Sequence, residues 1–314
     1  MKKNFTLAIH GGAGSVPKKY LEENRTSYEA LLNSTLKHGK SLLEAGKRAS
    51  EVVVEIVSML EDSDKFNAGK GSVLNHAGEV TMDASFADGK TMEFGSVINV
   101  KFVKNPIKLA HKLFEFKEHN MISGDGALEF ARENNLELET MEYFVTEYRK
   151  KQLEKAQRAG SFCLDHFDEN THPPEKDDSK YGTVGAVAMD IYGDLAAATS
   201  TGGITNKMYG RVGDSPIMGA GIFASNASVA VSSTGRGEVF SQHLVAYDLH
   251  ARMIYKKDSI KTASESIIAN SLPKGSGGII AVDNKGNYSM PFNTDMMFRG
   301  AVTQDHLMIG IEPD

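Results

Sequence analysis

A threonine hydroxyl is the first group in this sequence whose residue type and surroundings suggest chemistry. Thr183 follows Gly182, where a polar, acidic tract with two adjacent prolines gives way to a run of small and apolar residues. A threonine hydroxyl is a weak nucleophile at neutral pH unless a base lies beside it. An N-terminal threonine supplies that base through its own α-amino group, whose usual pKa is about 7.7 to 8.0. Cleavage between Gly182 and Thr183 would therefore create a nucleophile, with the hydroxyls of Thr201 and Thr234 as candidate neighbours.

From spacing alone, each of these residues also has a purely structural explanation. Thr183 can simply begin a strand, and Thr234 and Asn67 can serve as turn residues. Arg211 and Asp214 lie three residues apart in a glycine-rich stretch and can form a surface ion pair worth under about 1 kcal/mol. Residue types and spacing are therefore compatible with both a catalytic and a purely structural role for these residues.

Other common site types find little support in the sequence. The ten histidines form no HExxH motif or close pair, and the single cysteine, Cys163, excludes a multi-cysteine metal site. The segment 88–91 (DGKT) resembles the end of a phosphate-binding loop, but Ala84 stands where that motif requires glycine. The segment 219–224 matches a dinucleotide fingerprint only loosely, and HGGAG at 10–14 has no GxSxG partner. We therefore expect no cofactor for catalysis.

Hydrophobic periodicity and turn residues predict the elements that would position these residues. Predicted helices span 26–59, with a break near Gly39, and 106–116, 125–134, 141–167, 239–255 and 260–271. Predicted strands span 5–9, 94–103 and 227–233, with hairpins at 183–189/195–201, at 277–293 and around the turn 75–78. Strands on one side and helices on the other indicate a layered arrangement.

Composition narrows the class of protein. The chain has 314 residues, of which 40% are hydrophobic and 24% charged, which suits one large or two modest compact domains. The net charge is −6 and the lysines are scattered, which argues against nucleic acid or an anionic membrane as a partner. No export signal and no run of roughly 18 apolar residues is present, so we expect a cytoplasmic protein. The tract 165–182 is predicted to be an exposed, flexible linker.

Several long segments, in one order, carry a specific resemblance. They are AIHGGAG, LEDSDKFNAGKGSV, MDASFADG, KNPIKLA, YGTVGAVAMD, STGGITNKMYGRVGDSPIMGAGIFA and SSTGRGE. Along almost its whole length the chain resembles the plant-type asparaginase or isoaspartyl peptidase family of N-terminal-nucleophile hydrolases. The resemblance implies an α+β fold, a four-layer αββα sandwich built as a single domain from residues 1–314.

The resemblance also assigns roles to particular residues. It implies self-cleavage between Gly182 and Thr183 into an α subunit, 1–182, and a β subunit, 183–314, that stay associated. The implied site consists of Thr183 as nucleophile, Thr201 as its hydrogen-bonding neighbour, Thr234 and Gly235 as oxyanion hole, Arg211 and Asp214 as partners of the substrate's α-carboxylate and α-ammonium groups, Gly235 and Gly237 as backbone contacts, and Asn67 as a supporting residue near the nucleophile.

A structural ion and an assembly follow from the same resemblance. Sodium would be bound by the main-chain carbonyls of Leu60, Glu61, Ser63, Phe66, Ala68 and Lys70. The cleaved α/β protomer would form a dimer. One segment departs from the family pattern: 91–97 (TMEFGSV) is bulkier and more acidic, which would affect packing near the site or a subunit contact.

The implied reaction is hydrolysis of isoaspartyl dipeptides and L-asparagine through a covalent β-aspartyl ester on Thr183. A glycosylasparaginase or a threonine endopeptidase would share the nucleophile. The former is typically exported and disulfide-bonded, and the latter usually carries longer insertions. An uncleaved, inactive binding protein of the same fold is the alternative from another functional class.

Overall fold

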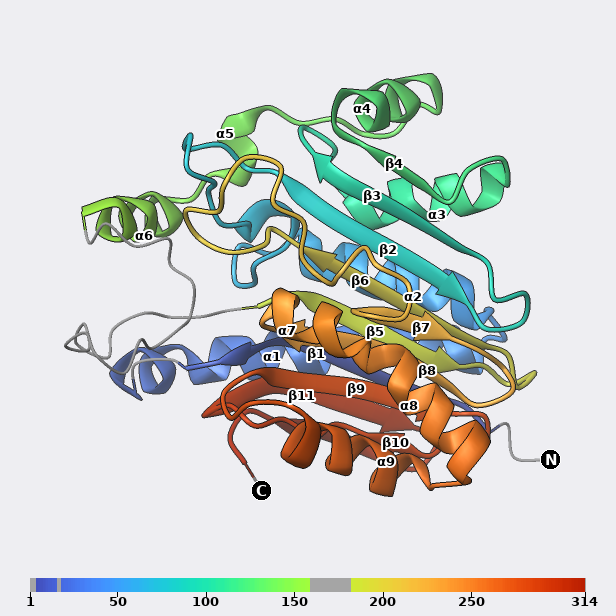
Figure 1. Ribbon diagram of the computed structural model, residues 1–314. Coiled ribbons are helices and arrows are strands. Elements are labelled where there is room, and N and C mark those ends of the chain that lie inside the picture. The colour runs from blue at the N-terminus through green and yellow to red at the C-terminus, as the bar shows by residue number, and fades with distance from the viewer. Residues whose placement is uncertain (1–3, 16–17, 159–181, 314) are drawn as a thin grey trace.

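Two β-sheets lie face to face in the computed structural model, which describes residues 4–15, 18–158 and 182–313 (Figure 1). The larger sheet has the strand order β12-β11-β1-β5-β6-β2-β3-β4, and the smaller has the order β10-β9-β8-β7. The strands are β1 (Thr6–Gly14), β2 (Met82–Asp88), β3 (Phe94–Val100), β4 (Met121–Ser123), β5 (Val184–Met189), β6 (Leu195–Thr201), β7 (Ile222–Ala224), β8 (Val229–Gly235), β9 (Gly277–Asp283), β10 (Tyr288–Ser289), β11 (Met296–Thr303) and β12 (Leu307–Gly310).

Helices cover both outer faces of the paired sheets. Against the larger sheet pack α1 (Lys18–Glu44), α2 (Ala49–Glu61), α3 (Pro106–Phe116) and α4 (Gly124–Glu133). Against the smaller sheet pack α8 (Val245–Ala251) and α9 (Ile260–Ser266), with α7 (Gly237–His243) and the π-helical turns η2 (Arg252–Lys256) and η3 (Ile267–Ser271) beside them. The 3₁₀ turn η1 (Gly69–Gly71), α5 (Met141–Phe144) and α6 (Glu147–Arg158) complete the described elements. The result is a mixed α+β fold with two sheets between helical layers. No helix in these segments is long and apolar enough to span a membrane.

Small apolar side chains fill the layer between the sheets. Ala8, Val187, Ala197, Ala230 and Ile280 belong to one buried cluster, contributed by strands of both sheets. Every residue of β5 and β6 is buried, because helices cover the outer face of these strands and the smaller sheet covers the inner face. The predicted hairpin at 183–189/195–201 is therefore confirmed.

Several element predictions were wrong, and the first concerns the break near Gly39. Helix α1 runs through Gly39 without a break, because this glycine packs against β1 and α2. A Cβ at Gly39 would lie 2.3 Å from Leu7 Cδ2 and 3.1 Å from Ile56 Cδ1. The helical break comes later, between α1 and α2, where Gly46 adopts a φ of 85°.

The hairpin predicted around residues 75–78 is the second correction. The turn itself is present, since the Gly78 N–H donates to the Asn75 carbonyl at 3.0 Å. However, residues 72–74 form no strand, and β2 pairs with β3 and β6 instead. Strands β4, β7, β11 and β12 were not predicted, and the helix predicted at 141–167 is divided into α5 and α6. The helix predicted at 239–255 is interrupted between α7 and α8, where Leu244 adopts a φ of 47°, and the strand predicted at 5–9 continues to Gly14. The remainder of that helix and positions 165–181 of the expected linker lie outside the described residues.

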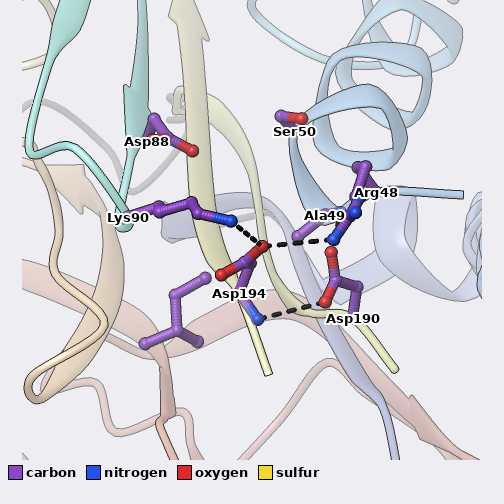
Figure 2. Close-up of a pocket in the computed structure, with 8 residues that line it drawn as sticks. Arg48, Ala49, Ser50, Asp88, Lys90, Asp190 and Asp194 are labelled. Atoms are coloured by element: carbon purple, nitrogen blue, oxygen red, sulfur yellow. Dashed lines mark hydrogen bonds and ion pairs between the residues drawn. The ribbon is translucent and has the colours of Figure 1, made fainter. Parts of the chain in front are cut away.

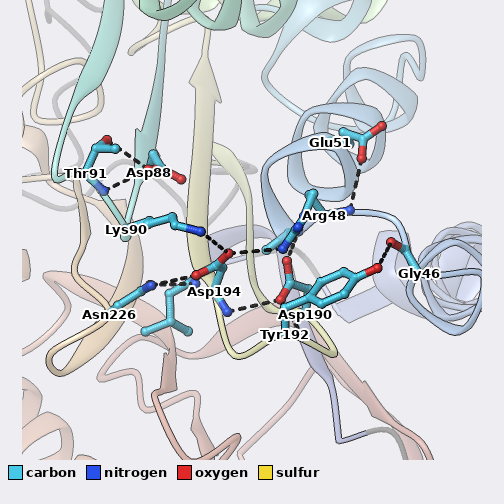
Figure 3. Close-up of polar contacts among 12 residues, drawn as sticks. Gly46, Arg48, Glu51, Asp88, Lys90, Thr91, Asp190, Tyr192, Asp194 and Asn226 are labelled. Carbon is cyan, nitrogen blue, oxygen red and sulfur yellow. Dashed lines mark hydrogen bonds and ion pairs between the residues drawn. The ribbon is translucent and has the colours of Figure 1, made fainter.

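A charged cluster ties the β5–β6 turn to α2 and to the β2–β3 turn. Arg48 and Lys90 approach Asp194 to 3.3 and 3.2 Å, and Figure 2 shows the three side chains pointing toward one another across a surface hollow of about 260 Å³. Asp190 Oδ2 accepts the Ala49 N–H at 3.0 Å and so helps to cap α2. Figure 3 shows the same contacts within their wider polar network. Because Asp194 pairs with both Arg48 and Lys90, we interpret the cluster as structural.

Candidate active site

The site predicted around Thr183 lies where β5 begins and β6 ends. Thr183 immediately precedes β5, is 6% exposed, and donates its hydroxyl hydrogen to Thr201 Oγ1 at 3.0 Å. Antiparallel pairing of Val184 with Ser200 brings the two threonines together. Strand register therefore produces the hydroxyl pair that the sequence suggested.

The turn after Thr201 is fixed by several hydrogen bonds. The Gly203 N–H donates to Thr201 Oγ1 at 3.0 Å, while the Asn67 amide donates to the Gly203 carbonyl at 2.6 Å. The Asn67 carbonyl accepts the Gly202 N–H at 3.0 Å, and its side-chain oxygen accepts the Val73 N–H, also at 3.0 Å. Asn67 thus supports the backbone that carries Thr201 and has no direct bond to Thr183 among these contacts.

Gly182, directly before Thr183, is enclosed by the glycine-rich second half of β1 (residues 10–14) and by β8. Gly12 has a φ of 112°, and a Cβ on it would lie 2.4 Å from the Gly182 nitrogen. A Cβ on Gly182 would in turn lie 2.5 Å from Thr234 Oγ1, which accepts the Ala13 N–H at 3.3 Å. Thr234 therefore lies beside the Gly182–Thr183 junction, where a hydroxyl donor could stabilise a developing oxyanion.

Gly235 follows Thr234 at the end of β8, with a φ of 143°. A Cβ at this position would lie 2.1 Å from the Ser276 carbonyl oxygen, so only glycine fits this backbone without displacement.

Arg211 and Asp214, predicted as the substrate clamp, lie together with Gly237. A Cβ on Gly237 would lie 3.0 Å from Arg211 Nη2, from the Asp214 nitrogen and from Asp214 Oδ1. Arg211 donates from Nε and Nη2 to the two carboxylate oxygens of Glu238, each at 3.0 Å. The arginine is thus paired, but with Glu238 rather than Asp214.

Asp214 is buried, and its Oδ2 has no hydrogen-bond partner among the described residues. Burial raises the pKa of Asp214 to about 7, against the opposing influence of hydrogen bonding to its own backbone and of the Arg211 charge. A buried carboxylate with an unused oxygen is a suitable partner for a ligand's ammonium group.

Two connections join this clamp to the hydroxyl pair. Ser215 follows Asp214, and its hydroxyl lies 3.5 Å from Thr183 Oγ1. A Cβ on Gly203 would lie 3.4 Å from Arg211 Nη1. Sequence reasoning missed Ser215, although it stands inside the quoted segment GRVGDSP, because a serine after an aspartate carries no distinctive pattern.

His10 was also missed as a neighbour of the nucleophile. Its ring lies across from Gly185, which leaves the space for it, and Nε2 is 2.8 Å from Ser232 Oγ. Burial lowers the pKa of His10 to about 3, although the Thr183 backbone partly opposes this shift. The imidazole is therefore neutral at physiological pH and acts as a packed, hydrogen-bonding group beneath Thr183.

The segment 91–97, which departs from the family pattern, runs from the distant end of the larger sheet toward this site. It forms the β2–β3 turn and the start of β3, where Phe94 pairs with Ala87, whereas Asp83 at the other end of β2 pairs with Thr201. Val97 pairs with Ala84, whose other neighbour is Ser200 beside Thr201, so an effect on packing near the site stays a prediction. The bulky Phe94, by contrast, lies at the distant end of β3. The charged hollow of Figure 2 is at this same distant end, because Leu195 and Thr201 are the two ends of β6, roughly 20 Å apart.

The loop predicted to bind sodium brings main-chain carbonyls close to glycines. A Cβ on Gly69 would lie 2.3 Å from the Glu61 carbonyl oxygen, and one on Gly71 would lie 2.1 Å from that of Phe66. The carbonyls of Leu60 and Ala68 accept N–H groups from Ser63 and Gly71, at 3.3 and 3.2 Å. Carbonyl oxygens are donors that a hard cation binds, and the sodium site in this loop stays a prediction. Elsewhere in the described chain, no group of three His, Cys, Asp or Glu residues is arranged to hold a metal.

This fold and this site place the chain in a known class, since the asparaginase family model matches residues 3–311. The chain belongs to this family. It is 45% identical over 296 residues to an isoaspartyl peptidase of Escherichia coli K12, covering 93% of this chain and 91% of the relative. A putative isoaspartyl peptidase/L-asparaginase of Dictyostelium discoideum is 43% identical, with 98% and 95% covered, and a human isoaspartyl peptidase/L-asparaginase is 38% identical, with 99% and 97% covered.

Proposed function

We propose that this protein hydrolyses isoaspartyl dipeptides and L-asparagine, with Thr183 as an N-terminal nucleophile. The observation that carries the proposal is the Thr183–Thr201 hydroxyl pair, 3.0 Å apart, beside the half-buried Arg211 and the buried Asp214, which suit the two charged groups of an amino acid. Family membership and the activities named for the relatives support it. The two sheets between helical layers are consistent with the αββα sandwich of N-terminal-nucleophile hydrolases, to which we assign the fold.

The nucleophile would be released by self-cleavage at Gly182. The Thr183 hydroxyl attacks the Gly182 carbonyl carbon, the peptide nitrogen leaves as the α-amino group of Thr183, and water hydrolyses the resulting ester. Thr234 Oγ1 lies beside Gly182 and can donate to the carbonyl oxygen as negative charge develops. The products are chains 1–182 and 183–314.

In turnover, Arg211 would bind the substrate's α-carboxylate and Asp214 its α-ammonium group. The free amine of Thr183 takes the hydroxyl proton as Oγ1 attacks the side-chain carbonyl carbon, and Thr201 orients the hydroxyl. Thr234 and the Gly235 N–H would stabilise the oxyanion, a contribution of roughly 3 to 4 kcal/mol per donor in other hydrolases. Collapse expels an amine or ammonia, and water then hydrolyses the β-aspartyl ester. Gly237 leaves room for this clamp beside the substrate.

Thr183→Ala tests this proposal. Intact mass analysis should show the wild type dividing after Gly182, while Thr183→Ala remains one chain and hydrolyses neither β-aspartyl dipeptides nor asparagine. Thr201→Val serves as a second variant, expected to cleave slowly and turn over poorly. A wild type that stays intact and inactive after prolonged incubation would overturn the proposal. Preferential hydrolysis of glycosylasparagine or of protein substrates would instead identify one of the two relatives that share the nucleophile.

Two further features accompany the proposal. A sodium ion held by the carbonyls of the loop 60–70 would stabilise the turn that carries Asn67. Replacing sodium with choline at equal ionic strength should then lower the melting temperature, and an unchanged melting temperature would contradict the sodium site. A dimer of cleaved α/β protomers is the proposed assembly, and sedimentation equilibrium giving a single-protomer mass would contradict it.

A further inference from the structure

Two buried charged residues, Lys207 and Asp83, have no part in the chemistry described above. Lys207 is 1% exposed, and its ammonium group donates to the carbonyls of Thr81 at 2.8 Å and Gly202 at 2.9 Å. Asp83 is fully buried, and its Oδ1 accepts the Asn99 N–H at 2.8 Å. Buried lysine and aspartate are costly unless their charges are compensated, so both residues require an explanation.

These two residues act on opposite ends of the loop 202–214. Lys207 holds the Gly202 carbonyl, directly after Thr201. Asp83 lies near the Gly213 backbone, directly before Asp214, and its Oδ2 has no hydrogen-bond partner among the described residues. Between these two points the loop carries Arg211, and a Cβ on Gly203 would lie 2.9 Å from Lys207 Nζ and 3.4 Å from Arg211 Nη1. Lys207 therefore lies beneath the part of the loop that presents the arginine.

Charge attraction couples the pair. Burial lowers the pKa of Lys207 to about 8, while the negative charge of Asp83 opposes the shift. Burial likewise raises the pKa of Asp83, and the positive charge of Lys207 opposes that shift. Each charge thus lowers the free-energy cost of burying the other in a site from which water is excluded.

We propose that Lys207 and Asp83 are positioning residues that hold the loop 202–214 so that Arg211 and Asp214 meet the substrate's α-carboxylate and α-ammonium groups together. This inference rests on the proposed function. Because the clamp binds groups that do not react, it contributes to ground state and transition state alike, and its loss raises KM more than it lowers kcat. Thr201 retains its bond to the Gly203 N–H and the support of Asn67, so the nucleophile is affected less.

Lys207→Met, Asp83→Asn and the double variant test the inference in the cleaved enzyme. Methionine keeps much of the length of lysine without its charge, and asparagine keeps an acceptor for the Asn99 N–H. For a β-aspartyl dipeptide, we expect Lys207→Met to raise KM at least about tenfold with kcat within about threefold, and Asp83→Asn to raise KM less. The double variant should be less impaired than the two single effects combined, because neither charge is left alone.

The control is Lys90→Met, which removes an exposed lysine paired with Asp194 at the far end of β6 and should leave both constants unchanged. Unchanged KM in Lys207→Met, with an active wild type, would overturn the inference alone. An equal fall in kcat and kcat/KM would also overturn it, because it would place the pair in the reaction itself. If Lys207→Met does not fold, Asp83→Asn is tested instead, and an unchanged KM in that variant would overturn the inference. A wild type without dipeptidase activity would overturn the proposed function instead.

Discussion

At the scale of single residues, the guanidinium group of Arg211 has two hydrogen-bonding edges with different surroundings. Nε and Nη2 form the edge that binds both oxygens of Glu238. Nη1 lies at the other end, where Cβ atoms on Gly213 and Gly203 would approach to 3.0 and 3.4 Å. A carboxylate can therefore be bound end-on at Nη1 and Nη2 while Glu238 keeps the arginine oriented.

Replacing Glu238 by glutamine should weaken substrate binding. The amide nitrogen of glutamine would face an arginine N–H, so one of the two hydrogen bonds is lost and the guanidinium becomes free to turn. We expect KM for a β-aspartyl dipeptide to rise about tenfold, with a smaller change in kcat, in steady-state kinetics. Glu129→Gln is the matched control, because it alters an exposed arginine–glutamate pair on α4. A KM equal to that of the wild type would mean that Arg211 needs no orientation by Glu238.

The raised pKa of Asp214, about 7, predicts a pH dependence of substrate binding. Below this pH the carboxyl group is protonated and cannot pair with an ammonium group, so KM should rise as the pH falls, by up to about tenfold per unit. Above it KM should level off. The measurement is KM for a β-aspartyl dipeptide between pH 5 and 8, compared with Asp214→Asn, which should show a high KM without this pH dependence. A flat KM in the wild type would exclude Asp214 as the ammonium partner.

At the scale of elements, periodicity predicted the β5–β6 hairpin and most helices, since their core-facing residues repeat regularly. It failed at Gly39, where close packing against Leu7 and Ile56, invisible in local sequence, keeps α1 continuous. The site shows the same limit. The resemblance identified Arg211 and Asp214 as site residues. The contacts of Glu238 with Arg211 and of Lys207 with Gly202 depend on how the loop 202–214 and the start of α7 fold, so the sequence could not predict them.

Gly12, in the second half of β1, should be required for self-cleavage. In Gly12→Ala, the new Cβ would lie 2.4 Å from the Gly182 nitrogen, so the junction with Thr183 must shift. Gly193→Ala is a matched control, because Gly193 also has a positive φ, 85°, but a Cβ there meets nothing within 4 Å. Both variants should lose roughly 1 to 2 kcal/mol of stability from backbone strain, and only Gly12→Ala should remain uncleaved on a denaturing gel. Equal cleavage of the two variants would contradict this role of Gly12.

At the scale of the whole molecule, the two proposed subunits interleave within one sheet. Strand β1 belongs to the part before Thr183, yet its neighbours on both sides, β5 and β11, belong to the part after it. Strand β6 likewise pairs with β2, which lies in the first part. Across these boundaries run continuous hydrogen-bond ladders as well as the buried layer between the sheets. Cutting the single peptide bond between Gly182 and Thr183, which precedes β5, removes none of these contacts.

The cleaved protein should therefore behave as one particle until it unfolds. On a denaturing gel we expect two chains, but size-exclusion chromatography should give the same elution volume as uncleaved Thr183→Ala, and the two chains should not separate on dilution. Thermal unfolding should remain a single transition, because β1 cannot leave the sheet without breaking two ladders at once. Uncleaved Thr183→Ala should refold after denaturation more completely than the cleaved protein, since only the latter must reassemble two chains at a concentration-dependent rate. Dissociation of the two chains under native conditions would show that the interleaved sheet does not hold the subunits together.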